Sequence, residues 1–228
     1  ERGYGVAIVD NEASGREWFE KHTEDALLQT YVSGVEYGVF YIRIPGEDQG
    51  RIYSMTHKEY TSVTGNGRNT LEQLILKHPR AVVHAREFCN RFADDLEKIP
   101  EEGETIKLVS IGTHSQGATF YDAAECASEP LRKALDQISH QVPGFYFGRY
   151  DLKSPDKESL MRGEFQILEI NGLTSEATHI YHPGYSYFHA VQVLMKQWQE
   201  AYRIGSINHQ AGLPYPSRLS VIKLMLEN

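Results

Sequence analysis

Two strand-like segments place the strongest constraint on what this chain can fold into. They are residues 145–151 (FYFGRYD) and 165–171 (FQILEIN), and each runs from aromatic or aliphatic residues into polar ones. Side chains two positions apart share one face of a strand. Arg149 is therefore expected beside Asp151, and Glu169 beside Asn171. The apolar residues expected on these same faces are Phe145, Phe147, Phe165 and Ile167.

The polar residues of the two segments predict a metal and phosphate site. If the strands are neighbours, the oxygen atoms of Asp151, Glu169 and Asn171 meet at one end of a sheet, with the Arg149 guanidinium alongside. Hard oxygen ligands with a nearby arginine suit Mg²⁺ that holds a polyphosphate. The competing interpretation is an ordinary ion pair of Arg149, with Asn171 as a turn residue before Gly172. The apolar strands favour burial, and buried charges are costly unless they are compensated.

Composition excludes several classes of protein. The chain has 228 residues, of which 40% are hydrophobic, so it can form one large domain or two small ones. A formal net charge of −8 argues against a general nucleic-acid binder. There is no apolar run long enough for a membrane span and no signal peptide, so we expect a cytoplasmic protein without a membrane partner. Cys89 and Cys126 lack metal-ligand spacing and are expected to be reduced thiols.

The pattern along the chain predicts an α+β fold with hairpins and no regular βαβ order. The expected strands are 5–10, 35–44, 51–55, 107–111 and 118–121, in addition to the two segments above. The expected helices are 14–28, with an apolar stripe, then 69–77, 80–96, 129–140, 185–202 and 217–226. Thr70 is expected to cap the second of these helices.

Other motifs are less specific. The pair Gly3 and Gly5 before an expected strand could let backbone N–H groups approach a phosphate, or could form a tight turn. Residues 29–36 could offer backbone groups to a purine edge and Glu36 to ribose hydroxyls, although Glu36 is also explained by ordinary strand alternation. The loop at 114–117 is a polar turn or a ligand contact. His179, His182 and His189 fit no common zinc spacing. Nothing supports covalent hydrolase chemistry.

Taken in order, these segments resemble the ATP-grasp superfamily of carboxylate-amine ligases, of which D-alanine–D-alanine ligase is a familiar member. The segment RGYGV at 2–6 is similar to the family's glycine-rich loop, and QTYVSGVE at 29–36 is similar to its adenine-binding hinge. RYD at 149–151 and EIN at 169–171 are similar to its metal-binding strands and are the most specific match. VTGNGRNTLEQLI at 63–75 and IGTHSQGA at 111–118 also resemble stretches of some members.

The resemblance implies roles for particular residues. Asp151, Glu169 and Asn171 would bind Mg²⁺, with Mn²⁺ as an alternative, and Arg149 would stabilise the transferred phosphate as the catalytic residue. The residues that would contact ATP are Gly3, Tyr4, Gly5, Gln29, Tyr31, Val32 and Glu36. Gln29 stands where many members have an acidic residue.

The implied activity is that of an ATP- and Mg²⁺-dependent ligase, which activates a carboxylate as an acylphosphate for attack by an amine or similar nucleophile. Residues 1–34 would belong to the glycine-loop subdomain and 35–228 to the catalytic subdomain, and homodimer formation is compatible with this interpretation. The family's phosphate-binding lysine and N-terminal substrate domain are expected upstream of Glu1. A non-catalytic nucleotide-binding or regulatory domain and a metal-dependent phosphohydrolase are the alternatives.

Overall fold

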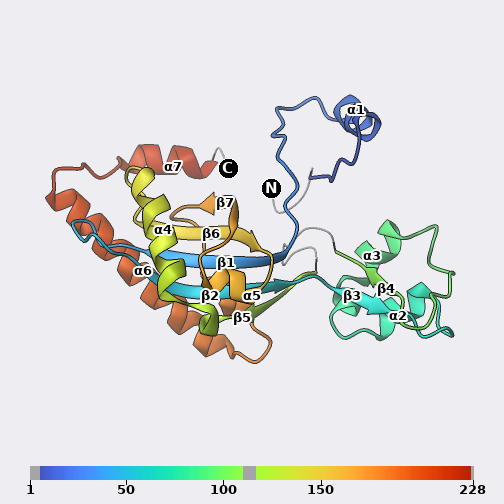
Figure 1. Ribbon diagram of the computed structural model, residues 1–228. Coiled ribbons are helices and arrows are strands. Elements are labelled where there is room, and N and C mark those ends of the chain that lie inside the picture. The colour runs from blue at the N-terminus through green and yellow to red at the C-terminus, as the bar shows by residue number, and fades with distance from the viewer. Residues whose placement is uncertain (1–5, 110–116, 227–228) are drawn as a thin grey trace.

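Antiparallel sheets flanked by helices make up the fold, as the alternation of sequence patterns predicted. The computed structural model describes residues 6–109 and 117–226. A five-stranded sheet has the order β5-β2-β1-β6-β7, and a two-stranded sheet pairs β3 with β4. Every pair of neighbouring strands is antiparallel. The α+β prediction is therefore confirmed (Figure 1).

The described part of the chain contains seven strands and seven α-helices. The strands are β1 (Val35–Ile42), β2 (Arg51–Glu59), β3 (Ser62–Thr64), β4 (Thr105–Lys107), β5 (Thr119–Asp122), β6 (Phe147–Ser154) and β7 (Gln166–Asn171). The α-helices are α1 (Glu12–Lys21), α2 (Leu71–Lys77), α3 (Ala85–Arg91), α4 (Glu129–Gln141), α5 (Lys157–Met161), α6 (Tyr187–Gln210) and α7 (Arg218–Leu226). Three 3₁₀ turns complete the described set: η1 (Ala81–His84), η3 (Ala124–Cys126) and η4 (Thr178–Tyr181).

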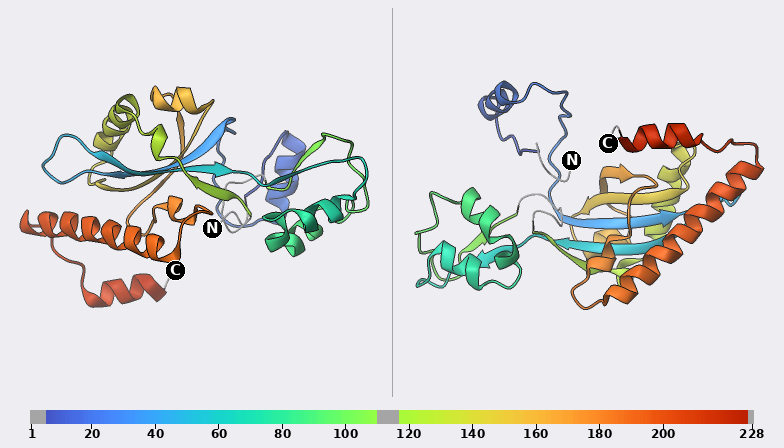
Figure 2. Two further views of the ribbon diagram at one scale, coloured as in Figure 1. Left: turned by 90° about the horizontal axis from the view of Figure 1, so that it is seen from below. Right: turned by 180° about the vertical axis from the view of Figure 1, so that it is seen from behind.

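Helices cover both faces of the five-stranded sheet. On one face, Tyr37, Val39 and Tyr150 pack with apolar residues of α4 and α5. On the other face, Phe40 and Phe147 pack with residues of α6. Figure 2 shows the sheet nearly edge-on, with α4 and α5 on one side and α6 on the other. The α6 side matters most here, because Arg149 and Asp151 follow Phe147 at two-residue intervals on that face.

Residues between β2 and β5 form a second lobe with its own core. Leu71, Ile75 and Phe88 are buried there against one another, together with Val63 and Leu108. Figure 1 shows α2, α3, β3 and β4 beside the end of the main sheet. The predicted cap of α2 is confirmed, since the Thr70 hydroxyl accepts a hydrogen bond from the Gln73 N–H at 3.3 Å.

The beginning of the chain differs from the prediction. Residues 6–10 are exposed and irregular, so the strand expected there is absent from the part that the structure describes. The helix α1 ends at Lys21 and buries none of its residues, so the apolar stripe expected over 14–28 is wrong as well. Asn11 begins the helix with a capping box, while an acidic first turn and Lys21 in the last turn favour its ends. Local capping and charge sustain α1 without a core contact.

One β-bulge corrects the expected faces of the second segment. The pairing of β6 with β7 runs from Asp151 opposite Glu169 directly to Leu152 opposite Ile167. The extra residue, Leu168, turns Ile167 to the α4 face and Glu169 to the opposite face, because a bulge shifts the alternation by one position. Phe165 and Phe145 also pack on the α4 side. These three apolar residues therefore do not share a face with the polar set.

Candidate functional site

The polar residues of β6 and β7 lie side by side, but within β6 and not at its expected end, because the strand continues past Asp151 to Ser154. Arg149 stands opposite Asn171, and Asp151 stands opposite Glu169, in antiparallel register. Residues directly opposite in such a pair extend their side chains to the same face of the sheet. The juxtaposition that the two sequence segments implied is therefore present in the fold.

Asp151 is the centre of this cluster. Its side chain accepts hydrogen bonds from Arg149 Nε at 3.0 Å, from Arg149 Nη2 at 3.1 Å and from Asn171 Nδ2 at 3.1 Å. Lys58 Nζ lies 3.1 Å from its Oδ1 atom. Burial by itself would raise the pKa of Asp151, but the charges of Lys58 and Arg149 outweigh burial and hold that pKa below its ordinary value. Asp151 is therefore held as a carboxylate.

Arg149 is fixed at both ends of its guanidinium. Two of its nitrogens bind Asp151, and Nη1 donates to the Glu176 carbonyl oxygen at 3.0 Å. Burial would lower the pKa of Arg149, but the adjacent Asp151 carboxylate raises it overall. A planar guanidinium held in this way keeps a fixed positive charge beside Asp151.

Lys58, on β2, joins Asp151 to Glu36, on β1. Its Nζ lies 2.7 Å from Glu36 Oε1, and both side chains are almost fully buried. The other oxygen of Glu36 accepts a hydrogen bond from the Tyr60 hydroxyl. Sequence patterns did not identify Lys58 and Tyr60, because both follow the expected strand 51–55 and have no distinctive spacing. The available signal was that Lys58 and Tyr60 follow Thr56 at intervals of two residues.

Gly38 makes room for this network. It lies on β1 between Thr56 of β2 and Asp151 of β6. A Cβ atom at Gly38 would lie 3.3 Å from Arg149 Cδ, 3.3 Å from Thr178 Oγ1 and 3.4 Å from Asp151 Oδ1. The missing side chain allows charged groups from β2 and β6 to meet across the intervening strand.

The predicted adenine-binding hinge at 29–36 contacts Lys153 of β6 and Leu168 of β7. Lys153, two residues after Asp151, donates through Nζ to the Val32 carbonyl oxygen at 2.9 Å. The Lys153 ammonium also lies 5.1 Å from the centre of the Tyr31 ring, within cation–π range. Gln29 Nε2 donates to the Leu168 carbonyl oxygen of β7 at 3.2 Å. The hinge segment therefore contacts the two strands that carry the polar cluster. Lys153 is a second cation that sequence patterns did not identify.

Glu169 differs from Asp151 in its surroundings. Its side chain is exposed and, among the residues that the structure describes, has no hydrogen-bond or ion-pair partner. The donor set therefore contains one free carboxylate, one engaged carboxylate and the Asn171 amide, whose Nδ2 now faces Asp151. Rotation of that amide would present its oxygen. Two carboxylates and an amide oxygen fit the ligand preference of Mg²⁺.

Other predicted site residues and groups have a simpler status. Gly3, Tyr4 and Gly5 lie outside the described residues, as does most of the 114–117 loop. Within 6–109 and 117–226, no three His, Cys, Asp or Glu side chains cluster closely enough to hold a metal ion by themselves. Cys89 and Cys126 are free thiols. None of the described helices has the length and apolar character needed to cross a bilayer.

Comparisons with known proteins include a distant structural likeness. A bifunctional glutathione synthetase from Pasteurella multocida superposes with a TM-score of 0.46 and 17% sequence identity, over 75% of this chain and 24% of that chain. The match thus spans about a quarter of that protein's length. No family model matches the chain, and no curated protein matches it.

Proposed function

We propose that this chain binds Mg²⁺-ATP and forms part of an ATP-dependent ligase that activates a carboxylate for attack by an amine. The observation that carries the proposal is the pairing of β6 with β7, which brings Arg149, Asp151, Glu169 and Asn171 together on one sheet face. The sequence resemblance of the same four residues to metal-binding strands supports it. The buried cations Lys58 and Lys153 beside them suit an anionic ligand.

Each residue of the cluster has a proposed role. Asp151, Glu169 and Asn171 would hold Mg²⁺, which when bound would neutralise phosphate charge. Arg149 would stabilise charge on the transferring γ-phosphoryl group, since its position is fixed before the ligand arrives. Lys58 would exchange part of its contact with Asp151 for a phosphate oxygen. Glu36 would accept hydrogen bonds from ribose hydroxyls.

The adenine base is assigned to the segment at 29–32, together with Lys153. Val32 already directs its carbonyl oxygen toward the Lys153 ammonium. The exposed ring of Tyr31 lies beside that ammonium and offers a flat apolar surface. Gly3, Tyr4 and Gly5 would cover the triphosphate and exclude water, as the resemblance implies.

The proposed reaction has two steps. A substrate carboxylate oxygen attacks the γ-phosphorus, and the bond to the β-bridging oxygen breaks to release ADP. The amine then attacks the acyl carbon, which forms the amide, releases inorganic phosphate and loses a proton to solvent. This chain's own residues orient the phosphoryl group and stabilise its charge. The exposed Glu169 carboxylate is the member of the cluster best placed to bind a ligand.

The proposal is tested by calorimetric titration of ATP with and without Mg²⁺, followed by measurement of ADP release with carboxylate and amine panels. Glu169→Gln should abolish the Mg²⁺-dependent part of binding without loss of fold, because Glu169 is exposed and has no hydrogen-bond or ion-pair partner among the residues that the structure describes. Glu164→Gln is the matched control, because this exposed carboxylate forms an ion pair with Arg162, outside the β6–β7 cluster. Equal Mg²⁺-ATP binding by wild type and Glu169→Gln would contradict the assignment.

A non-catalytic nucleotide-binding domain is a second candidate, favoured by one observation. Both carboxylate oxygens of Asp151 are engaged by protein groups, which are two cationic partners and an amide donor. A carboxylate engaged in this way is compatible with a domain that only binds nucleotide. Binding of ATP with no ADP release under any substrate combination would favour this candidate over a ligase.

A further inference from the structure

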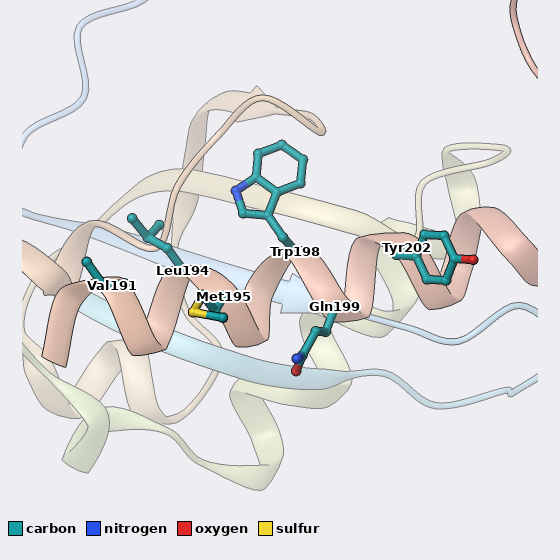
Figure 3. A pocket seen from close by; sticks show the side chains of 6 residues that line it. All are labelled: Val191, Leu194, Met195, Trp198, Gln199 and Tyr202. Atoms are coloured by element: carbon teal, nitrogen blue, oxygen red, sulfur yellow. The ribbon is translucent and has the colours of Figure 1, made fainter. Parts of the chain in front are cut away.

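The helix α6 has a second apolar face that nothing in the described chain covers. Val193, Ala201 and Ile207 pack with the core beneath the sheet, and Gln197 and Ile204 are buried on that same side. The side turned away from them carries Phe188, Val191, Met195, Trp198, Tyr202 and Gly205. We call these six positions the α6 seam. Figure 3 shows four of them, with Leu194 and Gln199 beside them.

The spacing of the α6 seam is that of a coiled coil. Its members follow one another at alternating intervals of three and four residues from 188 to 205. A repeat of 3.5 residues is the signature of a helix that pairs with another helix along its length. A surface that only met solvent would have no reason to keep this repeat in apolar residues.

The exposed area is large enough to form an interface. Phe188 is 82% exposed, Tyr187 77%, Tyr202 77% and Trp198 50%. With about 200 Å² for each aromatic side chain, these four residues alone present on the order of 600 Å². A standard interface buries about 800 Å² per partner, so the α6 seam and the flanking Tyr187 together supply most of one half. A groove of about 510 Å³ along Val191, Met195 and Trp198 offers a place for inserted side chains.

Sizes along the α6 seam match those of a second, antiparallel copy. When two such helices run in opposite directions with paired seam positions, Phe188 faces Gly205, Val191 faces Tyr202 and Met195 faces Trp198. Two of these layers set a large aromatic residue against the small residues Gly205 and Val191. The space beside Gly205 is open, since a Cβ atom there would have no neighbour within 4 Å. Phe188 of the other copy fits that space.

Charge also favours a like partner. The positions that flank the seam are Tyr187, Gln192, Leu194, Gln199, Ala201 and Ser206, all of them uncharged. Two copies therefore meet here without the repulsion that a chain of net charge −8 would otherwise bring. An oppositely charged partner would find no complementary charge at these positions.

The chain's own helix α7 is a less complete occupant. Its nine residues are about 14 Å long, whereas the α6 seam extends over about 26 Å at 1.5 Å per residue. It could cover the Trp198 end of the seam but would leave the Phe188 end exposed.

We propose that the α6 seam is the interface of a homodimer in which two copies of α6 pack antiparallel, with Phe188 of each copy against Gly205 of the other. This inference is independent of the proposed nucleotide chemistry. It predicts a particle of twice 26.0 kDa in solution.

Sedimentation of the full chain at micromolar concentrations tests the proposal. We expect a dimer for wild type and a monomer for Met195→Glu, because a charge would be buried against Trp198. Val83→Glu is the matched control, since Val83 is an exposed apolar residue of the separate lobe and its change should leave the dimer intact. A wild-type monomer at every accessible concentration would overturn the proposal, as would a dimer that Met195→Glu leaves unchanged.

The antiparallel register is tested by a size exchange. Gly205→Leu should weaken dimerisation about tenfold or more, because the added side chain fills the space for Phe188, while its Cβ atom has no neighbour within 4 Å in the monomer. Adding Phe188→Ala to Gly205→Leu should restore much of the lost affinity. Circular dichroism checks that the helices are retained. A dimer unaffected by Gly205→Leu, or no recovery in the double variant, would refute the register.

Discussion

Lys58 and Asp151 are 3.1 Å apart, from Nζ to Oδ1, although their strands β2 and β6 do not pair with each other. Both strands pair with β1, and the contact passes over Gly38. Lys58 also binds Glu36, so one ammonium serves two buried carboxylates. This buried bridge connects the two halves of the sheet face across β1.

Lys58→Met should destabilise the fold by about 3 kcal/mol, since removing one partner of a buried pair leaves an uncompensated charge. The buried Glu36 carboxylate loses its only cation among the described residues, while Asp151 keeps Arg149. Urea unfolding measures the change. The control is Lys98→Met, which removes an exposed pair with Asp95 and should lower the free energy of unfolding far less than Lys58→Met does. Equal losses in the two variants would contradict a buried bridge.

Asp151 should make the fold sensitive to acid. Its pKa lies below the ordinary value of 3.8, so its contribution to the free energy of unfolding is fully present above pH 3.8. That contribution is lost as the pH falls through the lower pKa of the folded state. Asp151→Asn should be less stable at neutral pH but lose less stability between about pH 5 and pH 2. Parallel pH profiles for the two proteins would exclude this role.

Tyr60 should have the opposite dependence on pH. Burial raises its pKa above 10.0, and the Glu36 carboxylate that accepts its hydrogen bond raises it further. A raised pKa contributes stability that is present below pH 10.0 and is lost as the pH rises above it. Tyr60→Phe should cost about 1–2 kcal/mol at neutral pH, through the lost hydrogen bond, and should remove part of the alkaline decline. Thermal unfolding at neutral and alkaline pH compares the two proteins.

Gly34 should tolerate substitution poorly. Its φ is +114°, and a Cβ atom would lie 2.4 Å from the Ser154 carbonyl oxygen of β6. Gly46 has a φ of +91° but no neighbour within 4 Å of such an atom. Both alanine variants therefore meet backbone strain of about 1 kcal/mol, and only Gly34→Ala adds a backbone clash, for a total of several kcal/mol. A calorimetric melting temperature that falls equally in both variants would refute the clash.

Sequence patterns predicted the elements that local chemistry controls. Thr70 was expected as a helix cap and is one, because a threonine hydroxyl three residues before Gln73 satisfies a free N–H group. The strands at 35–44 and 51–55 were recognised as a hairpin and form β1 and β2. The strand expected at 5–10 is wrong, since an apolar run of this length becomes a strand only when another strand pairs with it.

Prediction of the cluster was partial for a similar reason. The four polar residues of β6 and β7 were identified from two-residue spacing, and Phe147 was assigned to the correct face, but Phe145, Phe165 and Ile167 were assigned to the wrong one. The bulge at Leu168 reverses which face the preceding side chains of β7 occupy, and no local feature of residues 165–171 predicts this bulge. Lys58 and Lys153 were missed, because a cation's function depends on which carboxylate or carbonyl the fold places beside it.

The amino-acid sequence by itself determined which residues could be strands, where helices begin, and that carboxylates, an amide and an arginine stand at the polar ends of two segments. Tertiary structure alone decided that Asp151 forms an ion pair with Lys58, which lies two strands away, while Glu169 is exposed to solvent. Spacing along the chain controls which side chains share a face of one strand. The order and register of strands control which charges meet across a sheet, and that depends on contacts between distant residues.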